Sequence, residues 1–170
     1  MAELASSERL QPSLLDRLTD YEPDKSAEAR DKRVLSIRAL REGVLRDLAW
    51  LLNTTKLIPT RDAAQYPFVA NSVLNFGMPD ISGVSLSGLD LLELERSIRQ
   101  AIWDFEPRII RSSVLVKAIS AEHGGASYNK VIFEIEGDMW AQPYPERLYL
   151  RTELDMEGSA FRISEVTGSA

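Results

Sequence analysis

The chain has 170 residues and no cysteine, and its 26 acidic and 20 basic residues leave a formal net charge of -6 at pH 7. This length suits one compact domain with tails, which buries roughly 70% of the surface exposed in the unfolded chain. The lack of cysteine excludes disulfides, thiolate catalysis and zinc-thiolate sites, and it is typical of a reducing compartment. Because the acidic balance gives no general attraction to phosphate groups, we expect no nucleic-acid partner.

The sequence also lacks the features of a membrane-spanning or exported protein. No run approaches the roughly 20 apolar residues of a membrane span, and residues 1–10 contain Glu3 and Glu8 where a signal peptide is basic and then apolar. We therefore expect a cytoplasmic protein with no cleaved signal and no direct membrane insertion. Basic residues cluster at positions 30–41, but acidic residues are interleaved with them, which indicates a solvated helix face.

The N-terminal part predicts an amphipathic segment followed by a linker. Leucines recur at helical spacing over Leu10 to Leu18, and the turn sequence Tyr21-Glu22-Pro23-Asp24 follows them. Apolar residues then repeat every three or four positions from Ile37 to Leu51, which predicts a helix ending near Asn53. We expect an N-terminal segment with its linker at residues 1–30 and a single α+β domain at residues 31–168.

The middle of the chain predicts a loop and then a small helix. Residues 54–64 are polar and contain a proline, which indicates a loop that includes a short strand at Leu57-Ile58. Pro67 suits the first position of a helix that runs to Gly77, where glycine serves as a C-terminal stop.

A longer helix is predicted next. Ser87 precedes Asp90 by three residues, a variant of the capping box that marks a helix start. The helix must stop before Pro107, since the proline ring disfavours helical geometry at the residue before it. Its apolar stripe consists of Leu91, Leu94, Ile98, Ile102 and Phe105.

Beyond this helix the apolar repeat changes from 3.6 to 2. Residues 110–119 are rich in β-branched residues, and apolar residues alternate with polar ones over 131–139 and 148–154. Residues 161–166 complete a set of half-buried strands with short connections. The predicted fold class is α+β, with helices packed on one face of a mostly antiparallel sheet of about four strands in a C-terminal meander.

No arrangement of residues predicts catalysis. His123 is the sole histidine and stands in a hairpin connection beside Gly124-Gly125, so it has no second histidine for a metal cluster. Glu134, Glu136 and Asp138 share one strand face, which indicates a solvent-facing side of the sheet more readily than a pair of glycosidase carboxylates. No glycine-rich phosphate loop occurs. We therefore expect no catalytic residue, no metal and no cofactor.

Two motifs lie where helices are predicted to end. In Glu106-Pro107-Arg108 the rigid proline fixes the directions in which the two charged side chains project. A helix stop with a local ion pair explains this motif, and sequence alone places that interpretation somewhat ahead of a recognition role. In Leu51-Leu52-Asn53-Thr54, asparagine fits a C-terminal cap and the hydroxyl groups can satisfy carbonyls of the last turn.

Five motifs, taken in order, resemble those of the TssE family of the bacterial type VI secretion system, and the resemblance spans nearly the whole chain. TssE is similar to the small wedge protein of contractile phage tails, a family once labelled lysozyme-like although its fold carries no lysozyme active site. The motifs are Ser13-Leu14-Leu15-Asp16-Arg17-Leu18, Leu51-Leu52-Asn53-Thr54, Ser72-Val73-Leu74-Asn75-Phe76-Gly77-Met78-Pro79-Asp80, Phe105-Glu106-Pro107-Arg108 and Leu148-Tyr149-Leu150-Arg151-Thr152-Glu153-Leu154.

This resemblance implies a non-enzymatic structural subunit of a baseplate wedge, which helps to join the wedge to a contractile sheath. It implies that Glu106, Pro107 and Arg108 attach the subunit within the wedge, with TssF and TssG as wedge partners and TssB and TssC as sheath partners. The implied location is cytoplasmic, at the base of a membrane-docked secretion apparatus. Two alternatives stay open: a regulatory adaptor module of the same fold and, ranked last, a peptidoglycan hydrolase.

Overall fold

The computed structural model describes residues 13–19, 23–24, 36–85, 88–119, 130–141 and 144–166. The expectations for Leu10, the basic residues at positions 30–33, Ser87 and His123 lie outside these residues. The helices are α1 (Leu14–Leu18), α2 (Ile37–Leu52), η3 (Thr60–Gln65), α3 (Pro67–Ala70), η4 (Val73–Asn75), α4 (Leu91–Phe105) and η6 (Arg111–Ser113).

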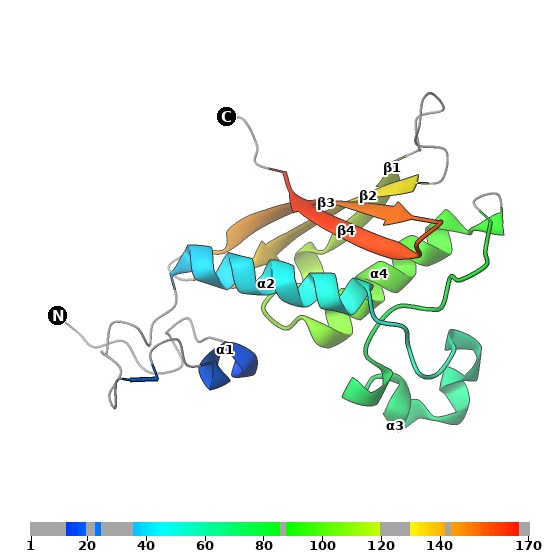
Figure 1. The fold of residues 1–170 in the computed structure, drawn as a ribbon, viewed down its shortest axis with the longest axis horizontal. Coiled ribbons are helices and arrows are strands. Elements are labelled where there is room, and N and C mark those ends of the chain that lie inside the picture. Colours follow the sequence, from blue (N-terminus) through cyan, green and yellow to red (C-terminus); the bar gives the residue numbers. More distant parts are fainter. Residues whose placement is uncertain are drawn as a thin grey trace.

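The C-terminal part forms one antiparallel sheet. The strands β1 (Leu115–Ile119), β2 (Lys130–Met139), β3 (Glu146–Asp155) and β4 (Ala160–Glu165) pair in the order β1-β2-β3-β4. The long helices α2 and α4 lie on the same side of this sheet (Figure 1). The predicted α+β class and antiparallel meander are therefore confirmed.

The core lies between the sheet and the two long helices. Alternate side chains of β2 are buried, whereas Glu134 between them is exposed and Glu136 and Asp138 are half-buried on the outer face. This is the pattern of a sheet with one covered face. The core side chains include Val44, Leu48 and Leu51 of α2, Ile98 and Ile102 of α4, and Val131, Phe133, Ile135 and Met139 of β2.

The ends of the long helices follow from capping groups. Ser36 starts α2, and its hydroxyl accepts a hydrogen bond from the main-chain N–H of Ala39. Asp90 is itself the N-cap of α4, because its carboxylate accepts from the N–H groups of Leu92 and Glu93. This corrects the predicted capping box, in which Asp90 lay inside the helix. An aspartate at the cap satisfies two of the amides that a helix start leaves unpaired.

The predicted helix from Pro67 to Gly77 is instead two short pieces, α3 and η4. Ser72 adopts an extended conformation with φ -95° and ψ 165°, and its hydroxyl donates to Val69 O and accepts from Leu74 N. A serine side chain that bonds nearby main-chain groups in this way competes with the helical ladder. Asn75, which is buried, holds the pieces together by donating to Ala70 O and accepting from Ile58 N.

The predicted strand at Leu57-Ile58 is also wrong. The pairing occurs two residues earlier, where Thr55 forms an isolated parallel bridge with Met78. Gly77 makes this possible, since its φ of 126° lies in the region that favours glycine and an added Cβ would lie 2.2 Å from Thr54 O.

The first strand is shorter than the pattern at residues 110–119 predicts. The short helix η6 occupies Arg111–Ser113, and β1 begins only at Leu115. Ile109 forms an isolated bridge with Met139, and the Ser113 hydroxyl accepts from the N–H of Asp138. These two contacts place residues 109–113 against the end of β2, ahead of the first residue of β1.

Candidate functional site

The Glu106-Pro107-Arg108 turn is a closed ion pair in the structure. Phe105 ends α4 and Glu106 is the C-cap, with its side chain only 3% exposed. One carboxylate oxygen accepts from Arg108 Nε at 2.7 Å and from the Arg108 main-chain N–H at 3.1 Å, and the other accepts from Nη2 at 2.5 Å. Such bidentate pairing fixes the orientation of the guanidinium plane.

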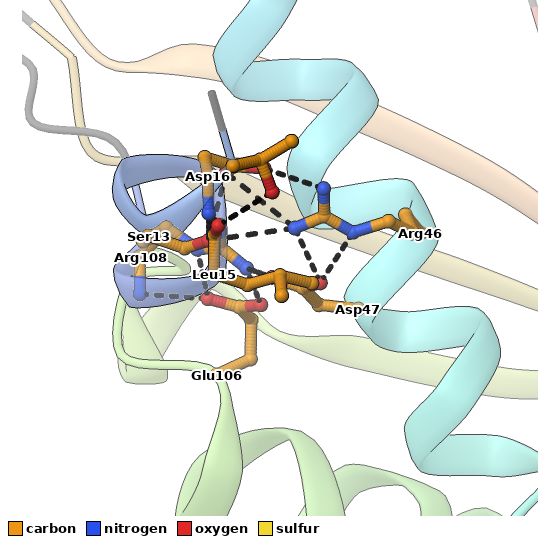
Figure 2. A network of polar contacts seen from close by, with 8 residues as sticks. Ser13, Leu15, Asp16, Arg46, Asp47, Glu106 and Arg108 are labelled. Carbon is orange, nitrogen blue, oxygen red and sulfur yellow. Dashed lines mark hydrogen bonds and ion pairs between the residues drawn. The ribbon is translucent and has the colours of Figure 1, made fainter. Parts of the chain in front are cut away.

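The pair continues into a chain of alternating charges across three segments (Figure 2). Arg108 Nη2 also donates to Asp47 of α2 at 2.6 Å, and the neighbouring Arg46 donates to the same carboxylate at 2.9 Å. Arg46 then reaches Asp16 of α1 at 2.5 Å. Two adjacent residues of α2 therefore make these contacts: Asp47 accepts from the turn, and Arg46 donates to α1.

Neighbouring charges shift the pKa values of Arg108 and Asp16. Burial alone would lower the pKa of the Arg108 guanidinium, but hydrogen bonds and attraction from Glu106 and then Asp47 outweigh it and raise that pKa. The hydrogen bond from Arg46 lowers the pKa of Asp16, with a smaller contribution from Ser13 against the opposing effect of burial. Arg108 and Asp16 therefore hold their charges at neutral pH.

Gly43 of α2 lies where α1 and the turn meet. Its position is buried, and a Cβ added there would lie 3.5 Å from Asp16 Oδ2 and 3.6 Å from Arg108 Nη1. A methyl group would fit there in ordinary contact with both. The carboxylate of α1 and the guanidinium of the turn thus sit against the same spot on α2.

The helix α1 is turned with its apolar side outward. Leu14 and Leu18 are 70% and 74% exposed, while Asp16 points toward Arg46 (Figure 2). Burial of leucine is the usual force that holds a helix on a protein, at about 25 cal/mol per Å² of apolar surface. Here the attachment rests instead on an ion pair and on the Ser13 hydroxyl, which lies 3.4 Å from Arg46 Nη2.

Side chains close parts of both sheet edges. The carboxamide of Asn53 accepts from Phe161 N at 2.8 Å and donates to Phe161 O at 2.9 Å on β4. On the opposite edge, Glu95 of α4 accepts from Ala118 N of β1 at 2.6 Å. Unpaired edge groups are sites for another strand, and such side chains occupy them.

The motif Leu51-Leu52-Asn53-Thr54 does what the sequence predicts and more. Asn53 is the C-cap of α2, and the Thr54 hydroxyl donates to Trp50 O at 2.7 Å, so the predicted capping is present. The contact with Phe161, 108 positions later, could not be predicted from local spacing.

The charge chain contains residues that the sequence did not single out for a site. Arg46 and Asp47 lie in the middle of a helical pattern that shows only which side is apolar. Asp16 belongs to a motif of the resemblance, but its contact with residues 30 positions away depends on how α1 folds back. The adjacent opposite charges of Arg46 and Asp47 were the one available signal, and surface helices carry many such pairs.

A second exposed feature lies on the segment between α2 and α4. Five large apolar side chains there are mostly exposed, and Phe68 is 94% exposed. These side chains offer apolar surface to another protein. The five are Leu57, Tyr66, Phe68, Val73 and Leu74.

The described residues offer neither a metal site nor a membrane helix. No group of three or more potential metal-ligating side chains occurs in that part of the chain. Its helices are all too short or too polar to cross a bilayer.

A comparison with protein-family models places the chain. The model described as baseplate wedge protein gp25 matches residues 38–144, which run from α2 into the connection after β2 and include the Glu106-Pro107-Arg108 turn. No curated protein and no solved structure matches the chain. TssE belongs to the same family, so the resemblance seen in the motifs is confirmed. The match covers more than half of the chain, which therefore belongs to the baseplate wedge protein gp25 family, a family of structural proteins of phage-tail-like baseplates.

Proposed function

We propose that this chain is the TssE-type wedge subunit of a type VI secretion machine, and that it helps to join the wedge to the contractile sheath. Family membership supports the baseplate role. The observation that carries the docking proposal is the rigid turn at Glu106-Pro107-Arg108, in which a buried carboxylate presents one guanidinium in a fixed orientation. The machine would place the protein in the cytoplasm, at the base of a membrane-docked apparatus.

The three residues of the turn have different parts in this proposal. Glu106 is buried and acts as a support that orients Arg108. Pro107 is exposed, and the Arg108 side chain is 20% exposed with no hydrogen bond to its Nη1 among the described residues. A hydrogen-bond acceptor of a partner protein, placed at this nitrogen, would then occupy the part of the guanidinium that Glu106 and Asp47 leave available. A preorganised side chain loses little conformational entropy on binding, which favours tight docking.

The free edge of the sheet is the docking element that we propose for a sheath protein. In the β3–β4 pairing, Ile163 and Glu165 direct their main-chain groups away from β3, as Phe161 does. Asn53 occupies those of Phe161, but no described residue pairs with the outward groups of Ile163 or Glu165. An extended segment of a sheath protein could add there as a further strand.

The apolar segment between α2 and α4 is consistent with a subunit that functions inside an assembly. Phe68 and Val73, at 94% and 81%, have the highest exposed fractions among the large apolar side chains that the structure describes. TssF and TssG are the partners proposed for the wedge, and TssB and TssC for the sheath.

No observation favours the adaptor or hydrolase alternatives over this function. A glycosidase needs one carboxyl group with a raised pKa beside a second carboxylate. Glu106 is the buried carboxylate of the described residues, and both of its oxygens accept hydrogen bonds from Arg108 and not from a second acid. We expect no cleavage of purified peptidoglycan, and cleavage that disappears on replacing one carboxylate would favour the hydrolase.

The direct test is reconstitution with the proposed partners. The chain is co-expressed with TssF and TssG of a bacterium that carries this secretion system, and the complex is isolated through a tag on TssG. We expect the chain to co-purify in fixed proportion and to restore sheath assembly in cells that lack their own TssE. Absence of both would contradict the wedge assignment, and co-purification without sheath assembly would limit the role to the wedge.

A further inference from the structure

Two arginine side chains lie against one tryptophan ring at the C-terminal end of α4. The guanidinium carbon of Arg99 is 5.5 Å from the centre of the Trp103 ring, and that of Arg111 is 4.9 Å from it. The indole N–H of Trp103 donates to Arg111 O at 2.9 Å, which ties α4 to η6. These contacts therefore hold the three side chains together in one cluster.

Neither arginine has an anionic partner in the part of the chain that the structure describes. Five other arginines do form such pairs, and the chain as a whole has a net charge of -6 and an excess of carboxylates. Arg111 is exposed and Arg99 is half-exposed, so solvent reaches both. The arginines with carboxylate partners are Arg38, Arg41, Arg46, Arg108 and Arg147.

Stacking on the ring prepares these groups to bind an anion. A guanidinium over an aromatic face is attracted to it and loses part of its freedom, while the N–H donors at its edge stay available. Two positive charges beside one ring also give this surface a local positive potential, which attracts an anion. Tryptophan and arginine are, with tyrosine, the residue types enriched where binding energy concentrates in protein interfaces.

We propose that Arg99, Trp103 and Arg111 form a binding surface for a carboxylate-bearing segment of a partner protein. Charge complementarity decides the chemistry, because the planar donor edge of arginine matches a carboxylate through two parallel hydrogen bonds. Nucleic acid is the less suitable partner, since phosphate-backbone binding needs many cations and the chain is acidic overall. This surface is separate from Arg108, whose guanidinium is already held by Glu106 and Asp47.

The indole N–H of Trp103 gives a direct reporter in NMR spectra of the full ¹⁵N-labelled chain, assigned with Trp103→Phe. An oligoglutamate peptide is titrated in, with the matching oligoglutamine peptide as its control. We expect oligoglutamate to shift this signal saturably and oligoglutamine to leave it in place. The double variant Arg99→Gln/Arg111→Gln should lose the saturable shift. Arg38→Gln/Arg162→Gln removes the same charge elsewhere and should retain it.

Thermal melting confirms that each variant is folded, and the exposed single change Arg111→Gln replaces the double variant if that one unfolds. The proposal is overturned if wild type shows no saturable shift, or if Arg99→Gln/Arg111→Gln and Arg38→Gln/Arg162→Gln respond alike. A short DNA duplex is titrated in parallel. A larger saturable shift with DNA than with oligoglutamate would make the surface a nucleic-acid site and would also overturn the proposal.

Discussion

The side-chain amide of Asn53 pairs with the main chain of Phe161 as a neighbouring strand would. Its oxygen accepts from the Phe161 N–H at 2.8 Å, and its nitrogen donates to the Phe161 carbonyl at 2.9 Å. The same nitrogen donates to Ala49 O at 2.8 Å, where α2 ends. One residue therefore caps a helix and fixes the distance between that helix and β4.

The first prediction is that Asn53→Ala lowers the free energy of unfolding by about 1–3 kcal/mol, because it removes three hydrogen bonds and leaves the N–H of Phe161 unpaired. Urea denaturation followed by circular dichroism measures the change. Thr54→Ala, which loses one hydrogen bond of the same helix end, should cost less. Equal stability of Asn53→Ala and wild type would contradict the edge-pairing role.

A second prediction concerns Thr152 in the centre of the sheet. Its side chain is fully buried, and its hydroxyl oxygen has no hydrogen-bond partner among the described residues. An unpaired buried polar group costs about 1–3 kcal/mol, so Thr152→Val should stabilise the protein by about 1 kcal/mol. In a chain of this size that raises the melting temperature by roughly 2–4 °C. Thr152→Ser keeps the hydroxyl and should not stabilise; a lower melting temperature for Thr152→Val would show that the hydroxyl is satisfied.

The fold could be predicted from the sequence because its elements repeat with clear periods. The apolar residues of α2 and the alternation around Phe133 fix which sides face the core. The errors occur where the hydrogen bonds of one polar side chain determine the local conformation of the main chain. Ser72 breaks a predicted helix and Asp90 begins another, and both act through hydrogen bonds that apolar spacing does not record.

The site could be predicted only in part, for a related reason. Pro107 marks the turn in the sequence, so Glu106 and Arg108 can be identified from it. Asp47 and Asp16 enter the charge chain through contacts 61 and 30 positions apart, which no local pattern shows. The recognition role of the turn, and the division of the chain at residues 30 and 31, stay predictions.

The third prediction is that α1 is loosely attached in the isolated protein. Its leucines face solvent, and a partly exposed ion pair such as Asp16 with Arg46 contributes about 0–1 kcal/mol. Amide hydrogen exchange over residues 15–18 should therefore be much faster than within α2. Asp16→Asn should speed it further, whereas Glu42→Gln, on the exposed pair of α2, should not. Protection of α1 equal to that of α2 would contradict this account.

Acid should weaken the same attachment. Arg46 lowers the folded-state pKa of Asp16 below its ordinary value of 3.8. A carboxylate whose pKa is lowered on folding contributes stability that is complete above the unfolded pKa and is lost as the pH falls through the folded one. An NMR titration of the Asp16 carboxyl should thus show an inflection below 3.8 that rises in Arg46→Gln. An unchanged inflection would mean that the pair does not form in solution.

Docking of the charged turn in the wedge is tested most directly by a variant that separates docking from folding. Arg108→Ala alone is unsuitable, because it leaves the buried Glu106 unpaired, which typically costs about 3–5 kcal/mol. Replacing both members with apolar residues of similar size often leaves stability unchanged. The variant is therefore Glu106→Leu/Arg108→Met, and its matched control is Arg38→Met/Glu42→Leu on the exposed pair of α2.

The measurement is co-purification of each variant with TssF and TssG, beside its melting temperature. We expect Glu106→Leu/Arg108→Met to melt near wild type yet no longer to co-purify, whereas the control variant should melt near wild type and co-purify. Normal co-purification of a folded Glu106→Leu/Arg108→Met variant would contradict the docking role, and would show that the turn only ends a helix.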